Sequence, residues 1–172
     1  MESEVRISVV QEYSEIAEIA ALADEVWHEH YSNLLSKGQI DYMVEKFQSE
    51  KAIVEAIAKD SYTYYAIRDA GQIIGYCAAQ PCEKDHSLFL SKLYIHADYR
   101  GKRISRLVMA MLSERCITDG YHSIWLTVNK GNKTSIEIYR KLGFTIEREQ
   151  VTDIGNGYVM DDYVMRYPVN LG

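Results

Sequence analysis

The sequence predicts an α/β or α+β sandwich built around a mixed sheet. Two observations support this fold class. Apolar residues recur at three- and four-residue steps in some stretches and at alternate positions in others, which indicates both helices and strands. The predicted order is strand, helices, three strands, helix, strand, helix and two strands. No repeat or linker interrupts the 172 residues, so we expect a single domain over residues 1–172.

The first sixty residues are expected to form one strand followed by helices. Residues 5–10 predict the strand, and a helix begins near Ser14. Two shorter helices are expected at residues 39–48 and 50–59, the second with Ser49 as its N-cap. The apolar face of the first helix comprises Ile16, Ile19, Ala23, Val26, Trp27 and His30.

The hydrophobic period then changes to two, which is typical of strands. Residues 62–68 and 72–80 flank the short turn Asp69-Ala70-Gly71, so they predict an antiparallel hairpin. Residues 88–95 predict a third strand in this series.

The C-terminal part alternates helices with strands. The next helix is expected to end at Gly120, because a residue without a Cβ can adopt the left-handed cap. Residues 124–128 are almost wholly apolar, which predicts a central strand covered on both faces. The buried stripe of the helix is expected to comprise Ile104, Leu107, Val108, Met111 and Leu112. The remaining elements are a helix over residues 132–142, a strand from Phe144, a turn at residues 155–157 and a strand over residues 158–167.

Charge is unevenly distributed along the chain. Residues 92–141 carry 10 Lys or Arg against 4 Asp or Glu, whereas the rest carries 9 against 21, so a local +6 lies within a protein of net charge −6. A basic segment in an acidic protein suits a small polyanion better than nucleic acid. No apolar run approaches the ~20 residues of a membrane span and no secretory signal opens the chain, so we expect a cytoplasmic protein without membrane contact. The three cysteines, Cys77, Cys82 and Cys116, lack the spacing of a disulfide framework or a zinc site.

A basic loop with one glycine joins the strand at residues 88–95 to the following helix. Backbone N–H groups at a helix N-terminus have no intrahelical acceptor and carry the positive end of the helix dipole. The loop is therefore expected to bind an anionic pyrophosphate. Its residues are Arg100, Gly101, Lys102, Arg103, Ile104 and Ser105.

A second motif follows about twenty-five residues downstream. It fits the pattern Asn-x-x-Ala/Ser-Ile-x-x-Tyr-x-Lys-x-Gly-Phe with Asn132, Ser135, Ile136, Tyr139, Lys141, Gly143 and Phe144. Together with the loop, which fits Gln/Arg-x-x-Gly-x-Gly/Ala from Arg100, it makes the chain resemble the GCN5-related N-acetyltransferase (GNAT) family over nearly its whole length. The loop departs from the family pattern at two positions, since Arg103 replaces the first motif glycine and Ser105 the second glycine or alanine.

This resemblance implies a mostly antiparallel sheet of six to seven strands flanked by helices on both faces, and acetyl-CoA as the cofactor. The loop, Asn132, Ser135 and Tyr139 are expected to bind it. The family also implies that the backbone amides of the strand before the loop bind the pantetheine arm and the developing oxyanion. These amides belong to Leu93, Tyr94 and Ile95. Tyr139 is expected to act as general acid, because an ordinary tyrosine pKa near 10 lies close to that of the departing thiol. Packing in the core beside Ile136 is the alternative for Tyr139.

The two motifs do not identify the residues that bind the acceptor amine. Glu83, Asp85 and His86 are candidates for the general base, and a solvated turn is the alternative. No metal is expected at His28-Glu29-His30, because residues two apart on a helix point about 200° away from each other. The expected wall of the acceptor pocket, for which core packing is the alternative, comprises Trp27, His30 and Tyr31.

We therefore expect an acetyl-CoA-dependent N-acetyltransferase whose acceptor, a primary amine, attacks the thioester directly. Residues 1–60 hold 13 Asp or Glu against 5 Lys or Arg, which favours a small cationic acceptor, and the first helices resemble those of bacterial polyamine acetyltransferases. The alternatives are acetylation of a protein N-terminus or lysine, and a non-catalytic acyl-CoA-binding regulatory module. The expected partner is a small-molecule amine, and a homodimer is left open.

Overall fold

The computed structural model describes residues 5–101 and 103–170. The chain divides into two compact units. The first comprises the residues up to Gln80 together with Ser91–Ile104, and the second comprises Pro81–Leu90 together with the residues from Ser105 onward. The first unit holds the expected acceptor-pocket residues and the second holds the downstream motif.

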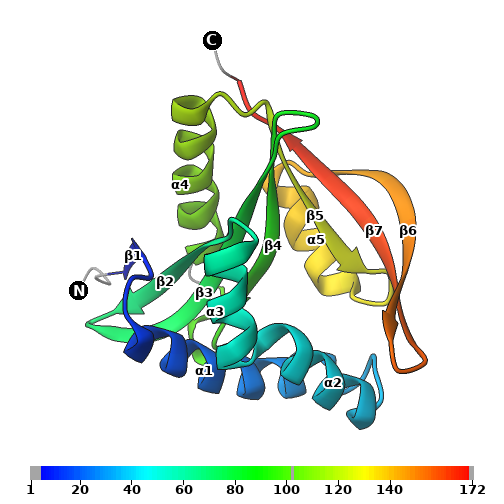
Figure 1. The fold of residues 1–172 in the computed structure, drawn as a ribbon. Helices are drawn as coiled ribbons and strands as arrows, with labels where there is room; N and C mark the ends of the chain where they lie inside the picture. The colour runs from blue at the N-terminus through cyan, green and yellow to red at the C-terminus, as the bar shows by residue number, and fades with distance from the viewer. Residues whose placement is uncertain (1–4, 102, 171–172) are drawn as a thin grey trace. The chain divides into compact units, whose positions relative to one another are not determined.

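The first unit consists of helices and antiparallel strands (Figure 1). Strands β1 and β2 pair from Val5 opposite Asp69, and β2 and β3 form the predicted hairpin, with Asp69 opposite Gln72. The elements are β1 (Val5–Val9), α1 (Tyr13–Tyr31), α2 (Lys37–Met43), the π-helix η1 (Val44–Gln48), α3 (Glu50–Lys59), β2 (Thr63–Asp69), β3 (Gln72–Cys82), the second half of β4 (Ser87–Ile95) and the 3-10 helix η2 (Ala97–Tyr99).

The second unit pairs the start of β4 with a β-sheet of three further strands. Residues Ser87 to Phe89 run parallel to Ser123 to Trp125, and β5 and β6 both pair with β7 in antiparallel fashion. The hydrogen-bonded strand order is β1-β2-β3-β4-β5-β7-β6, which confirms the mixed, mostly antiparallel sheet of seven strands. The remaining elements are α4 (Ile104–Asp119), β5 (Ser123–Asn129), α5 (Lys133–Leu142), β6 (Thr145–Gly155) and β7 (Tyr158–Pro168).

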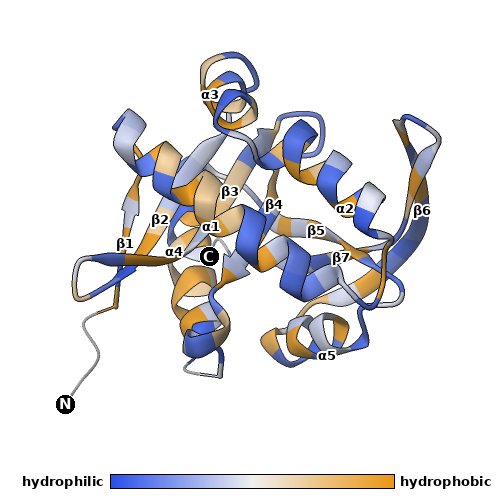
Figure 2. Ribbon diagram, turned by 90° about the horizontal axis from the view of Figure 1, so that it is seen from below, coloured by the Kyte–Doolittle hydropathy of each residue, from blue (hydrophilic) through white to orange (hydrophobic). Residues whose placement is uncertain are grey.

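The predicted helix ends are mostly confirmed. Ser49 caps α3 by accepting a hydrogen bond from the Ala52 amide, and Gly120 adopts φ +82° after α4. Hydrophobic and hydrophilic residues alternate around α1 (Figure 2), and its buried residues are Ile16, Ile19, Ala23, Val26 and Trp27. No helix in the described part of the chain combines the length and the apolar character that crossing a bilayer requires.

Three expectations about elements were wrong in part. Leu107 is 48% exposed, because the buried stripe of α4 follows four-residue steps from Ile104 through Val108 and Leu112, and Leu107 lies to one side of it. Strand β5 is buried on one face only, since Trp125 and Thr127 on its other face are half-buried. The helix expected at residues 39–48 changes after Met43 into the wider turns of the π-helix η1.

Candidate active site

Two residues of the loop between β4 and α4 have left-handed backbone conformations. Gly101 has φ +78° and Arg103 has φ +60°. The left-handed conformation at Arg103 explains why a glycine is usual at this motif position, and here an exposed arginine adopts it. Nothing lies within 4 Å of a Cβ added to Gly101, so the loop is open at that point. Lys102 lies outside the described residues.

The start of α4 offers backbone donors directly after this loop. The buried side chain of Ile104 fixes the first residue of the helix, and Ser105 is half-buried. The amides of a first helical turn have no intrahelical acceptor and lie at the positive end of the helix dipole. The loop and the helix start can thus present several N–H groups to one anion.

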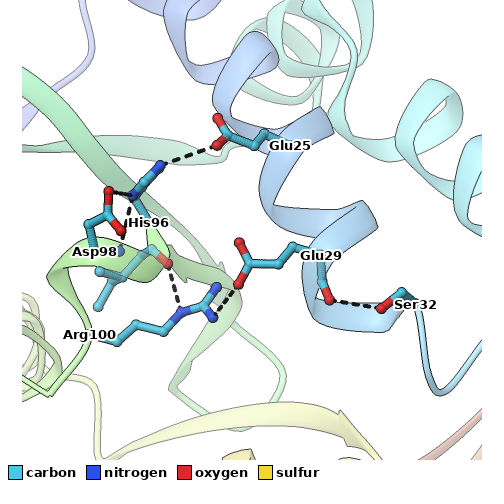
Figure 3. Close-up of polar contacts among 7 residues, drawn as sticks. Glu25, Glu29, Ser32, His96, Asp98 and Arg100 are labelled. Carbon is cyan, nitrogen blue, oxygen red and sulfur yellow. Dashed lines mark hydrogen bonds and ion pairs between the residues drawn. The ribbon is translucent and has the colours of Figure 1, made fainter.

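Arg100 is turned toward α1 (Figure 3). Its Nη1 lies 2.8 Å from a Glu29 carboxylate oxygen, and its Nε donates to the Ile95 carbonyl at 3.1 Å. Its backbone amide donates to the Ala97 carbonyl at 3.3 Å. The polar groups of Arg100 are therefore engaged within the first unit.

His96 makes a second link between the loop and α1 (Figure 3). Its Nε2 lies 3.2 Å from Glu25, and its Nδ1 accepts a hydrogen bond from the Asp98 amide at 3.2 Å. Glu25 and Glu29 are one helical turn apart, so one face of α1 binds the loop at two points.

The end of β4 directs one predicted amide away from β3. The His96 amide donates to the Ile74 carbonyl of β3 at 2.8 Å, so the Ile95 carbonyl of the same peptide points the opposite way. The Tyr94 carbonyl lies against Gly75 of β3, 2.7 Å from where a Cβ would stand. The Ile95 amide belongs to that peptide and therefore also points away from β3. Leu93, Tyr94 and Ile95 all have half-buried side chains.

The residues expected to line the acceptor pocket form one aromatic cluster. Trp27 lies 4.7 Å from Tyr31 and 5.3 Å from Tyr94 between ring centroids, and His30 packs edge-on against Tyr31 at 4.7 Å. Trp27 is only 4% exposed and belongs to the core, whereas His30 and Tyr31 are half-buried. Burial, with a smaller contribution from Arg100, lowers the pKa of His30 and so favours a neutral ring.

Lys92 is a polar residue of the same unit that sequence reasoning missed. Its ammonium donates to the Phe47 carbonyl of η1 and, at 2.7 Å, to the Tyr64 hydroxyl. No carboxylate pairs with it among the described residues, and burial lowers its pKa to about 7. A lysine within the apolar run of β4 was the available signal.

In the second unit, the downstream motif has a clear structural role. Asn132 is 7% exposed and caps α5, its Oδ1 accepting a hydrogen bond from the Ser135 amide at 3.2 Å. Tyr139 is half-buried, and its ring meets that of Phe144 edge-on at 5.6 Å. Gly143 ends the helix with φ +113°, where a Cβ would lie 2.9 Å from the Tyr167 ring.

The three candidates for the general base lie on an exposed turn. The Tyr121 hydroxyl donates to Glu83 at 3.3 Å. A hydrogen bond from Ser87 lowers the pKa of Asp85, which weakens Asp85 as a base. His86 has φ +51° and stands edge-on to His122 at 6.2 Å.

The residues His28, Glu29 and His30 take separate partners. His28 lies 2.5 Å from Asp41, Glu29 binds Arg100, and His30 packs on Tyr31. Hydrogen bonds to Asp41 and to the Asp24 backbone raise the pKa of His28.

Comparison with known proteins agrees with this geometry. The model of the Acetyltransferase (GNAT) family matches residues 19–144. L-methionine sulfoximine/L-methionine sulfone acetyltransferase from Pseudomonas paraeruginosa (strain DSM 24068 / PA7) is 28% identical over 114 residues, which cover 64% of this chain and 66% of that protein. Streptothricin acetyltransferase from Streptomyces lavendulae is 28% identical over 85 residues, covering 49% and 45%. The chain thus spans just under two thirds of the first relative and less than half of the second.

The fold matches a solved structure over nearly its full length. The PaiA N-acetyltransferase from Thermoplasma acidophilum, solved in complex with coenzyme A, superposes with a TM-score of 0.79 at 18% identity, covering 98% of this chain and 99% of that one. GNAT enzymes are acetyltransferases that use acetyl-CoA, so the family, enzyme class and cofactor implied by the two motifs are confirmed. Since the family model covers most of the sequence, the chain belongs to the Acetyltransferase (GNAT) family.

Proposed function

We propose that this acetyltransferase transfers the acetyl group of acetyl-CoA to the primary amine of a small molecule by direct attack. The observation that carries the proposal is the backbone of the β4–α4 loop. Gly101 and Arg103 are left-handed, and the loop leads directly into the first turn of α4.

This loop fits a pyrophosphate. The amides of Gly101, Arg103, Ile104 and Ser105 would hold it, because the left-handed positions turn the chain and the helix start adds unpaired donors. Arg100 acts here as a positioning residue, since its side chain binds Glu29 and Ile95. Lys102, also predicted to bind, has no described structure to support it. When bound, acetyl-CoA supplies an acetyl group activated as a thioester.

Two groups of the chain are placed in catalytic roles. The Ile95 amide points away from β3 and is assigned to the developing oxyanion, with the Leu93 and Tyr94 backbones binding the pantetheine arm. Tyr139 is assigned to protonate the departing thiolate. It is the tyrosine of the family motif, and its side chain is half-buried. Asn132 and Ser135 support this assignment by fixing the start of α5.

The acceptor is inferred from charge and from the relatives. The acidic residues of the first sixty positions outnumber the basic ones 13 to 5, which attracts amines. The curated relatives carry the names of small-molecule substrates, methionine sulfoximine and streptothricin, which favours a small acceptor over a protein. His30 and Tyr31 are the residues we assign to its pocket, with Trp27 supporting them from the core.

The test combines acetyl-CoA with a panel of amines and measures thiol release. Tyr139→Phe should keep acetyl-CoA affinity and lower kcat by roughly 100-fold, the usual size of one general-acid contribution. Tyr13→Phe, which removes an exposed hydroxyl that binds Glu50, is the matched control and should leave kcat unchanged. An unchanged kcat in a folded Tyr139→Phe protein would show that Tyr139 only packs in the core. Binding of acetyl-CoA without turnover of any amine would favour a regulatory module.

A further inference from the structure

Asp162 on β7 is a buried carboxylate that has no counterion among the described residues. It is 2% exposed, and its Oδ1 is buried without a hydrogen-bond partner in the described part of the chain. No ion pair joins it to any described lysine, arginine or histidine. Burying an ionised carboxylate without a partner is costly, so such a group calls for an explanation.

The two residues that directly face Asp162 across the sheet are engaged elsewhere. Asn129 on β5 and Gln150 on β6 are its register partners. The Asn129 Oδ1 accepts a hydrogen bond from the Gly131 amide at 2.8 Å. Gln150 accepts from Arg148 at 2.9 Å and donates to Thr152 at 3.3 Å. Neither side chain hydrogen-bonds the Asp162 Oδ1.

The charged groups nearby also satisfy one another. Lys130 lies 2.8 Å from Asp161 and 3.1 Å from Glu149, so its charge is neutralised by two other carboxylates. Arg148, diagonally across on β6, is exposed and binds Gln150. Burial raises the pKa of Asp162 to about 6, with Asp161 adding to the effect and Lys130 opposing it.

Strand alternation places Asp162 on the sheet face opposite to α5. Tyr167 contacts Phe144, which in turn contacts Tyr139 of α5. Side chains alternate along a strand, so the even-numbered Asp162 and the odd-numbered Tyr167 lie on opposite faces. The proposed general acid and Asp162 therefore approach the sheet of this unit from different sides.

We propose that Asp162 is the acceptor-binding general base: its carboxylate binds the ammonium of a primary amine and takes the proton that the attacking nitrogen releases. This inference rests on the proposed acetyl transfer. The nitrogen forms a bond to the acetyl carbon while the carbon–sulfur bond breaks. Two protons leave the nitrogen through Asp162 to water, the first from the bound ammonium before attack and the second as the amide forms. The Tyr139 hydroxyl gives its proton to sulfur and is reprotonated from water, so one proton is released overall.

The energetics favour a cationic acceptor. An ammonium supplies the counterion and the donor that the buried carboxylate lacks, whereas a neutral or anionic acceptor leaves it unpaired. Near neutral pH the carboxylate is mostly ionised yet still basic enough to accept a proton, which suits a general base. The raised pKa of Asp162 and its missing partner thus both suit a carboxylate that binds an ammonium and accepts a proton.

The test compares Asp162→Asn with Asp161→Asn, a neighbouring carboxylate on the same strand. The probe amines are spermidine and L-methionine sulfoximine. In Asp162→Asn, kcat/KM should fall by about 100-fold or more, the acidic limb of its pH profile near pH 6 should disappear, and acetyl-CoA affinity should stay unchanged. Asp161→Asn should keep kcat/KM and retain the limb, displaced toward lower pH because Asp161 contributes to the raised pKa of Asp162.

The pH dependence of the melting temperature separates a functional Asp162 from a merely structural one. The pKa of Asp162 in the folded protein lies above its ordinary value of 3.8, so the folded state loses stability as pH rises from about 4 through 6. Asp162→Asn removes this penalty, and its Tm should exceed that of the wild type by roughly 6–12 °C above pH 7 but not near pH 4. A lower Tm at pH 8 would mark Asp162 as structural and overturn the inference.

The outcomes separate this inference from the proposed function. Turnover that persists in Asp162→Asn overturns the role of Asp162 and leaves acetyl transfer standing. If the wild type has no turnover, a Tm increase caused by the amines that is lost only in Asp162→Asn supports the amine site while the proposed function fails. An amine-induced Tm increase that both variants share with the wild type contradicts the amine site.

Discussion

Gly75 stands at a close approach between β3 and β4, and Gly75→Ala tests that geometry. An added Cβ would lie 2.7 Å from the Tyr94 carbonyl oxygen and 3.3 Å from the Ile95 Cα, both backbone atoms that cannot rotate away. Alanine normally stabilises a strand interior by about 0.5–1 kcal/mol relative to glycine. Overpacking costs about 1–3 kcal/mol, so the cost of the overlap exceeds the gain from alanine. We expect a net loss of about 1–2 kcal/mol and a Tm lower by roughly 2–8 °C.

The same substitution should also weaken cofactor binding, because β4 must shift and carries the Ile95 amide with it. Thermal unfolding followed by circular dichroism, and calorimetric titration with acetyl-CoA, measure the two effects. The control is Gly71→Ala at the β2–β3 turn, where φ is +85° and nothing lies within 4 Å of the added Cβ. It should lose stability through backbone strain but keep acetyl-CoA affinity. A Gly75→Ala protein as stable as the wild type would show that β3 and β4 do not approach each other this closely at Gly75.

Two further substitutions test residues of the loop and of β4. Arg103→Gly should be about 1 kcal/mol more stable than Arg103→Ala, because only glycine adopts the left-handed φ of +60° without strain. Both variants should bind acetyl-CoA as the wild type does, since the Arg103 side chain is exposed. A tenfold loss of affinity in both, measured by calorimetry, would show instead that the guanidinium contacts phosphate. Lys92→Met should remove a pH dependence of the unfolding free energy. Burial lowers the pKa of Lys92 to about 7, so above that pH the unfolded state binds more protons than the folded state. The wild type therefore gains stability as pH rises toward 9. Urea unfolding at pH 7, 8 and 9 should show this gain, at most about 1.4 kcal/mol per pH unit, in the wild type alone, and equal slopes in both proteins would contradict the lowered pKa.

Local signals predicted most of the fold. The change of hydrophobic period located the hairpin of β2 and β3, and Gly120 marked the end of α4 because its φ of +82° favours glycine. Arg103 has a left-handed φ at the position where the family pattern has glycine. Such features depend on a few neighbouring residues, which a sequence displays directly.

Features that depend on distant residues could not be predicted. The Arg100 guanidinium pairs with Glu29, 71 positions away, and no local pattern indicates that partner. Lys92 is buried against Phe47 and Tyr64, and its lowered pKa follows from that packing alone. In the sequence Asp162 looks like any acidic residue of an alternating strand, and its burial with an unpartnered Oδ1 is visible only in the structure. A sequence does not show which carboxylates are buried.

The most direct test of the central claim is a steady-state assay of the purified protein with acetyl-CoA and single amines. Release of free thiol is followed together with mass-spectrometric detection of the acetylated amine. We expect thiol release that depends on a small primary amine, saturates with its concentration and gives an N-acetyl product, with one acetyl group transferred per thiol. Thiol release without an acetylated product, or acetyl-CoA binding with no release for any small amine, would contradict it.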